Sequence, residues 1–158
     1  MTRKTYRQLA AEAAERIAEI MPWEVADFIA ENPDTLILDI RERDEFDGVR
    51  IRNALNVPRG ILESAAEWDY VETEPELVLA RARPVLIICR SGNRSALAAE
   101  VLVDIGFENV RSVKLGVRGW NDADLELIDS LGEVVDGDDA HNMLEQPLRP
   151  DQIDPARR

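Results

Sequence analysis

Apolar and polar residues along the chain predict short buried strands that alternate with helices. Apolar positions recur at helical spacing from Thr5 to Ala18, and a second helix is predicted from Trp23 to Ala30, after a proline suited to its first turn. Further helical patterns cover residues 60–80, with a break near Pro75, and residues 96–105. Four short β-branched or leucine-rich runs predict strands: residues 35–40, 54–57, 85–88 and 110–115. This alternation favours an α/β fold with a parallel sheet covered on both faces.

The segments between and after these elements differ in character. Residues 41–52 and 116–120 show no periodic pattern and are predicted to be irregular. The last 27 residues carry seven acidic residues, three basic residues and three prolines, a composition typical of a tail that packs weakly or not at all. We therefore predict an N-terminal helical extension (1–18) that packs on the domain rather than docking a partner, a folded domain (19–131), and an acidic, proline-containing tail (132–158).

Composition and charge limit the classes of partner. The chain has 158 residues and a formal net charge of −13, which fits one acidic globular domain. Such a body repels nucleic acids and anionic lipid, so neither is expected as a partner. No apolar run approaches the roughly 20 residues of a membrane span, and residues 1–20 lack the continuous apolar stretch of a signal peptide. We therefore expect a soluble, cytoplasmic protein.

The chain contains one cysteine, Cys89, and one histidine, His141. These counts exclude an internal disulfide, a redox dithiol and a zinc site built from several cysteines and histidines. A Cys–His pair could use only His141, which stands in an Asp-rich stretch and is expected to be exposed in the tail. We therefore expect Cys89 to act without an imidazole and without a metal.

Cys89 stands between the most apolar predicted strand and a predicted helix. A lone cysteine is commonly a small buried hydrophobe, but this position is where doubly wound sheets bind ligands. Loop amides and a helix N-terminus converge there and favour negative charge, so we expect Cys89 to be a thiolate at neutral pH. The following loop supplies two cations, a flexible glycine and three short polar residues as candidate anion ligands: Arg90, Ser91, Gly92, Asn93, Arg94 and Ser95.

Two chemistries need a nucleophilic sulfur beside a second anionic group. One is transfer of sulfane sulfur through a Cys89 persulfide, and the other is hydrolysis of a phosphate ester with an arginine on the phosphate oxygens. Cysteine phosphatases have the arginine six positions after the cysteine, whereas Arg94 stands five positions after Cys89. A smaller ring suits a single sulfur atom, and the chain offers no clear general acid for a phosphate leaving group. Sulfur transfer is therefore favoured.

The segment Cys89–Ser95 resembles the active-site loop of the rhodanese-like single-domain sulfurtransferases. Three further segments resemble motifs of that family in the same order: Leu38–Arg41 with Glu45-Phe46, Ala54–Pro58, and Leu115–Trp120. The resemblance covers roughly residues 20–122. It implies a doubly wound rhodanese-like fold with a central five-stranded parallel sheet, and a cysteine persulfide held by the loop amides from Arg90 to Ser95. It also implies that no metal or organic cofactor is needed.

The chain departs from the family pattern at several positions near the expected site. Tandem-domain thiosulfate sulfurtransferases bind the donor through an arginine at the position of Glu45 and a lysine at that of Ser91, so thiosulfate is disfavoured as the physiological donor. Asp39 and Arg41 are expected to form a structural ion pair, and Trp120 is expected to pack beneath the loop. Three arginines are candidate substrate contacts: Arg50, Arg52 and Arg59.

We predict a sulfurtransferase of the thiosulfate:cyanide type. It moves sulfane sulfur from a small anionic donor through Cys89 to an outside acceptor, which is cyanide, a thiol or a partner protein. Two alternatives stay open at this point: a sulfur-carrier or binding module that serves one partner protein, and a cysteine phosphatase or arsenate reductase. An inactive module is disfavoured because the cysteine and its loop are both intact.

Overall fold

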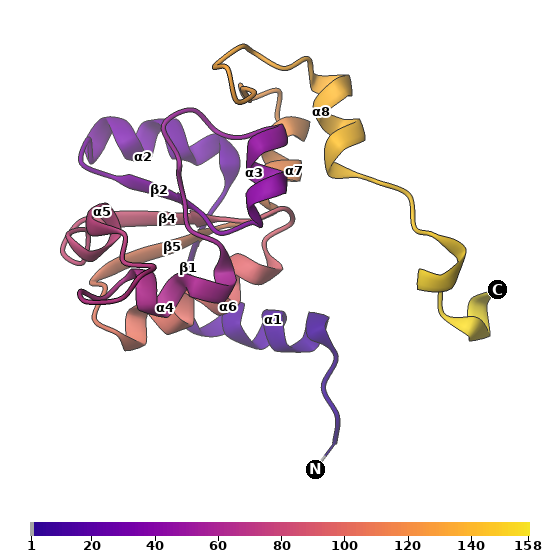
Figure 1. Ribbon diagram of the computed structural model, residues 1–158, viewed down its shortest axis with the longest axis horizontal. Helices are drawn as coiled ribbons and strands as arrows, with labels where there is room; N and C mark the ends of the chain where they lie inside the picture. The colour runs from indigo at the N-terminus through magenta and orange to yellow at the C-terminus, as the bar shows by residue number, and fades with distance from the viewer. Residues whose placement is uncertain (1) are drawn as a thin grey trace.

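The computed structural model describes residues 2–158 and contains a five-stranded sheet in the order β1-β5-β4-β2-β3 (Figure 1). All four strand pairs are parallel. The strands are β1 (Ala18–Ile20), β2 (Leu36–Asp39), β3 (Leu55–Asn56), β4 (Pro84–Ile88) and β5 (Asn109–Val113). The predicted α/β fold with a central parallel sheet is confirmed.

Helices cover both faces of the sheet (Figure 1). One face carries α1 (Tyr6–Arg16), α4 (Leu62–Ala65), α5 (Pro75–Val78) and α6 (Asn93–Asp104). The other carries α2 (Val25–Glu31), α3 (Arg43–Gly48), α7 (Gly116–Asp122) and α8 (Gly137–Leu144). Short 3₁₀ turns complete the described chain: η1 (Pro22–Glu24), η2 (Arg59–Ile61), η3 (Pro150–Gln152) and η4 (Pro155–Arg157).

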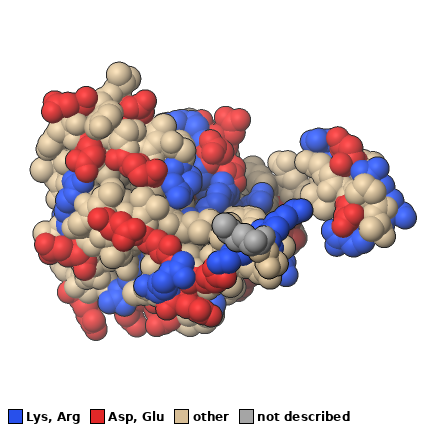
Figure 2. All heavy atoms as spheres, turned by 90° about the horizontal axis from the view of Figure 1, so that it is seen from below, with Lys and Arg blue, Asp and Glu red and all other residues tan. Residues whose placement is uncertain are grey.

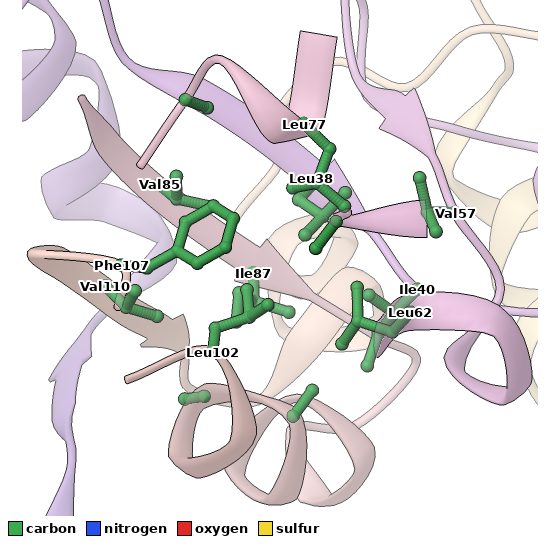
Figure 3. Packing of buried hydrophobic residues seen from close by; sticks show 14 of the residues in the cluster. Leu38, Ile40, Val57, Leu62, Leu77, Val85, Ile87, Leu102, Phe107 and Val110 are labelled. Atoms are coloured by element: carbon green, nitrogen blue, oxygen red, sulfur yellow. The ribbon is translucent and has the colours of Figure 1, made fainter. Parts of the chain in front are cut away.

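Strand β4 divides the hydrophobic core into two layers. Successive side chains of a strand point to opposite faces, so Val85 and Ile87 enter one layer while Leu86 and Ile88 enter the other. Figure 3 shows the first layer, where Ile87 lies among side chains from α6, β2 and β5. All five β4 residues are buried, which explains why this strand is a continuous apolar run in the sequence.

Several short elements differ from the sequence predictions. The periodic pattern extends the first helix through residue 18, but the chain enters β1 there and pairs with β5. Helix α3 lies within a segment predicted to be irregular, α7 begins in another and extends two residues beyond it, and α6 begins inside the predicted loop. The predicted helix 60–80 is instead η2, α4 and α5, separated by a turn at Asp69, whose φ is 71°. Elements this short are stabilised by tertiary contacts rather than by their own periodicity.

The prediction that residues 132–158 pack weakly or not at all is wrong for α8. Ala140 and Leu144, four residues apart on one face, are buried in the second core layer. The Asp136 side chain caps the helix by accepting hydrogen bonds from the amides of Asp138 and Asp139. The acidic composition therefore reflects a helix N-terminus and an exposed face. Beyond Pro147 the chain does extend away from the body (Figure 1).

A buried ion pair fixes the carboxyl end of β2. Asp39 and Arg41 are both at most 1% exposed, and the guanidinium Nη2 donates to the Asp39 carboxylate at 2.8 Å. The guanidinium also donates to the carbonyl oxygens of Glu45 and Val49, at 3.3 and 2.7 Å. Arg41 therefore holds the middle of α3, and the residue that follows this helix, against the carboxyl end of β2.

The first turn of α7 holds the backbone that follows β4. The amides of Val117 and Arg118 donate to the carbonyl oxygens of Cys89 and Arg90, at 2.8 and 3.0 Å. Gly116 has a φ of +61°, and a Cβ there would lie 2.4 Å from the Cys89 carbonyl oxygen. Only glycine fits both the left-handed conformation and this close approach.

We expect Arg41→Ala to lower the free energy of unfolding by about 3–5 kcal/mol, because it leaves the Asp39 carboxylate buried without its partner. Urea unfolding with linear extrapolation measures the change. The control is Arg149→Ala, which removes an ion pair whose side chains are 68% and 71% exposed and should change stability by less than about 0.5 kcal/mol. Equal effects of the two substitutions would contradict the organising role of the buried pair.

We expect Gly116→Ala to detach α7 from the backbone at residues 89–90, because the added Cβ cannot fit. Amide hydrogen exchange at Val117 and Arg118 should become faster. Gly60→Ala is the control, since no atom lies within 4 Å of a Cβ at that position. If hydrogen exchange at both amides is unchanged in Gly116→Ala, the backbone accommodates the methyl group by a shift that leaves these two hydrogen bonds intact.

Candidate active site

Cys89 directly follows β4 and lies at the N-terminal end of α6. Its side chain is buried, and Sγ accepts hydrogen bonds from the amides of Gly92, at 3.1 Å, and Ser95, at 3.3 Å. Gly92 adopts a φ of +98°, which turns the chain back over the sulfur before α6 begins. Cys89 is thus both part of the core and the acceptor of two loop amides.

Four further amides of this loop have no acceptor among the described residues. Within residues 2–158, the backbone N–H groups of Arg90, Ser91, Asn93 and Arg94 donate to no other group of the chain. Asn93 and Arg94 occupy the first turn of α6, where amides have no carbonyl partner inside the helix. The carbonyl oxygens of Cys89 and Arg90 are engaged by α7. The loop therefore offers several amide donors around one sulfur atom.

Two serines extend the polar contacts of Cys89 into the core. The Ser95 hydroxyl lies 3.4 Å from Sγ and 2.8 Å from the hydroxyl of Ser112 on β5. Both serines are fully buried, and Ser112 pairs with Ile87 of β4 in the sheet. Sequence reasoning included Ser95 but missed Ser112. The signal was a polar residue at an inward-facing position of a strand.

Arg94 is engaged by Glu45 of α3. Two of its guanidinium nitrogens donate to the two carboxylate oxygens, at 2.9 and 3.0 Å. The hydrogen bond to Glu45 raises the pKa of Arg94, burial opposes that shift, and the charges of Glu45 and Cys89 add to it. Arg94 therefore lies within the electrostatic reach of Cys89, but its cation is already neutralised. The sequence did not reveal this pairing.

Glu45 stays ionised because of its partners. Burial raises the pKa of Glu45, but hydrogen bonds from Arg94 and from the Glu42 amide, with the charges of Arg94 and Arg41, lower it below its ordinary value of 4.5. The site therefore carries a fixed carboxylate beside the loop. Arg90, by contrast, is exposed and makes no ion pair with any residue from 2 to 158.

The remaining candidates contact other parts of the protein. Trp120 packs in the second core layer, and its indole N–H donates to the Glu126 carbonyl oxygen at 2.9 Å. The three candidate arginines have protein partners: Arg50 stacks on Phe46, Arg52 pairs with Glu126, and Arg59 pairs with Glu63. His141 is half exposed, as expected, and lies 3.7 Å from Glu145.

Hollows lie on both sides of the active-site loop. One of about 490 Å³ is lined by Trp23, Ser91, Leu115 and Arg118, and one of about 370 Å³ separates α1 from residues 91–93. The described residues hold no group of three acidic, histidine or cysteine side chains that could bind a metal. None of the helices in this part of the chain is long and apolar enough to cross a membrane.

Comparison with known proteins identifies the family. The model of the rhodanese-like domain matches residues 22–123. The adenylyltransferase and sulfurtransferase UBA4 of Meyerozyma guilliermondii is 33% identical over 90 residues, which are 56% of this chain and 20% of that protein. A putative mitochondrial thiosulfate sulfurtransferase of Schizosaccharomyces pombe is 30% identical over 93 residues, 56% of this chain and 64% of that protein. The chain thus spans less than two thirds of either relative.

A solved structure from Rhodopseudomonas palustris, described as a protein of unknown function and possible tyrosine phosphatase, is also similar. It is 26% identical, with a TM-score of 0.68 over 78% of this chain and 94% of that chain. The fold and the order of the motifs agree with the match to the family model, which spans more than half of the sequence. The protein belongs to the rhodanese-like domain family.

Proposed function

We propose that the protein is a sulfurtransferase in which Cys89 carries sulfane sulfur as a persulfide. The observation that carries the proposal is the set of backbone amides around one buried sulfur: two donate to Sγ, and four have no acceptor among residues 2–158. A persulfide adds one sulfur atom with a negative charge, and the free amides supply donors for that charge. A cofactor has no part in this proposal.

The reaction proceeds in two half-reactions. In the first, the Cys89 thiolate attacks the outer sulfur of an anionic donor such as thiosulfate. The new Sγ–S bond forms as the S–S bond of the donor breaks, and sulfite leaves with the electron pair. In the second, an acceptor nucleophile attacks the terminal sulfur and the Sγ–S bond breaks. Its electron pair returns to Cys89 as the thiolate, which gives ping-pong kinetics.

The sulfur must leave to an acceptor outside the chain, because Cys89 is the only cysteine. Cyanide or a small thiol can serve in an assay. The name of the Meyerozyma relative includes a sulfurtransferase activity, which supports sulfur transfer as the reaction of this chain. We therefore propose a thiol or a partner protein as the cellular acceptor.

A phosphatase is the second candidate, because the similar Rhodopseudomonas structure is described as a possible tyrosine phosphatase. The arginine that would hold the phosphate oxygens is Arg94, and Glu45 occupies its guanidinium through two hydrogen bonds. Because this pairing leaves Arg94 unavailable to a phosphate group, it favours sulfur transfer. If the protein hydrolyses p-nitrophenyl phosphate and Cys89→Ser loses that activity, the phosphatase becomes the favoured function.

We expect thiosulfate treatment to increase the intact mass of the protein by one sulfur atom. Cys89→Ser should show no increase, and neither should protein first blocked with iodoacetamide, which controls for sulfur bound elsewhere. Cyanide should then restore the original mass within the turnover time of an enzyme. Slow discharge to cyanide would favour a sulfur carrier, and an unchanged mass with a reactive thiol would contradict the proposal.

We expect Glu45→Gln to raise kcat/KM for thiosulfate about 3–10-fold at low ionic strength, because it removes a negative charge that repels the dianion. The gain should shrink as salt is added. Because the pKa of Glu45 lies below its ordinary value, the carboxylate is ionised throughout the neutral pH range. The gain in kcat/KM should therefore be the same across that range.

Glu67→Gln is the matched control for this charge change. Glu67 pairs with Arg81, which precedes β4 and so lies at the opposite end of the sheet from Cys89. This variant should leave kcat/KM unchanged. A fall in kcat/KM for Glu45→Gln would show that the ion pair is needed to position Arg94, and would overturn the repulsion argument.

A further inference from the structure

Helix α1 lies outside the segment matched by the family model, yet it runs beside α6. Each of the two helices leads into one of two neighbouring parallel strands, β1 and β5, so α1 and α6 run in the same direction (Figure 1). Ala10 and Ala13 are buried on the packed side of α1. The N-terminal end of α1 therefore lies at the same edge of the sheet as Cys89.

An ion pair indicates which levels of the two helices lie side by side. Arg16 contacts Glu100 at 2.6 Å. Leu9 lies seven residues before Arg16 on α1. Asn93, the first residue of α6, lies seven residues before Glu100. Since both helices rise by about 1.5 Å per residue, Tyr6 lies nearly one turn further, level with the active-site loop. The hollow lined by Arg7 and Ala10 together with Ser91, Gly92 and Asn93 agrees with this register.

The first turn of α1 is rigid at this position. The Thr5 hydroxyl accepts from the Gln8 amide at 3.1 Å, and the Gln8 side chain accepts from the Thr5 amide at 2.8 Å. This capping box fixes Tyr6 as the first residue of the helix. Burial raises the pKa of Tyr6, the charge of Cys89 raises it further, and the charges of Arg94 and Arg90 oppose the shift. The phenol is therefore protonated at neutral pH and in electrostatic contact with the site.

We propose that Tyr6 is a substrate-binding residue that donates its phenolic hydrogen to the anionic sulfur donor at the mouth of the active site. Arg90, which has no ion-pair partner among residues 2–158, lines a hollow with residues of α3 and α8 and adds a positive charge near the site. Basic side chains gather near the middle of the face shown in Figure 2, on an otherwise largely acidic body. This inference rests on the proposed sulfurtransferase function, and it adds a residue that the family segment does not contain.

The functional test compares two phenylalanine variants in the thiosulfate:cyanide assay. Tyr6→Phe should lower kcat/KM for thiosulfate about tenfold, since it removes one hydrogen bond to a charged group. It should leave kcat/KM for cyanide unchanged, because ping-pong kinetics separate the two half-reactions. Tyr70→Phe changes the only other tyrosine and should alter neither value. An unchanged kcat/KM for thiosulfate, or a fall confined to cyanide, would overturn the assignment.

A second test does not depend on sulfur transfer. In the Tyr70→Phe background Tyr6 is the only tyrosine, so ultraviolet titration reports its pKa alone. Cys89→Ser should lower that pKa, because the thiolate charge that raises it is gone. A pKa that does not respond would overturn the placement of Tyr6. A normal response in a protein that forms no persulfide would instead show that the proposed function, and the substrate role with it, has failed.

Discussion

The structure depends on the orientation of the peptide groups around Cys89, whose carbonyl oxygens point away from the sulfur and whose amides point toward it. Carbonyl oxygens at residues 89 and 90 accept hydrogen bonds from the first turn of α7, while the amides of Gly92 and Ser95 donate to the sulfur. The reverse arrangement would place oxygen dipoles against a thiolate and repel it. Gly116 permits this orientation of the peptide groups, because any side chain there would collide with the Cys89 carbonyl. A glycine twenty-seven positions after the cysteine thus determines the electrostatics of the sulfur.

A second set of contacts connects the core to the charge balance of the site. Arg41 of the buried Asp39–Arg41 pair also donates to one carbonyl oxygen in the middle of α3 and to another just after it, and α3 places Glu45 against Arg94. Buried ion pairs contribute little net stability, since desolvation offsets their attraction. We therefore interpret this pair as a positioning device. It holds a carboxylate beside the loop, so Arg94 is neutralised while Arg90 stays free to meet an anion.

The sequence was sufficient for features that local pattern determines. The buried strand before Cys89 is a continuous apolar run, and the loop glycine marks a turn, so the position of the cysteine followed directly. Features set by distant contacts were not accessible. Strand β1 has three residues and exists because β5 lies beside it, and Ser112 reaches the site only through the register of β5 on β4. The acidic composition that suggested a loose tail concealed the apolar face of α8.

These observations bear on where the functional unit begins. The family match starts at residue 22, yet β1 and the helix before it lie earlier in the chain. Without β1, the β5 strand would become an exposed edge, and without α1 the outer surface of α6 would lose the two alanines packed against it. The same helix places Tyr6 near the level of the active-site loop. The N-terminal segment therefore completes the sheet and packs against α6, and under our proposal it also contributes Tyr6 to the site.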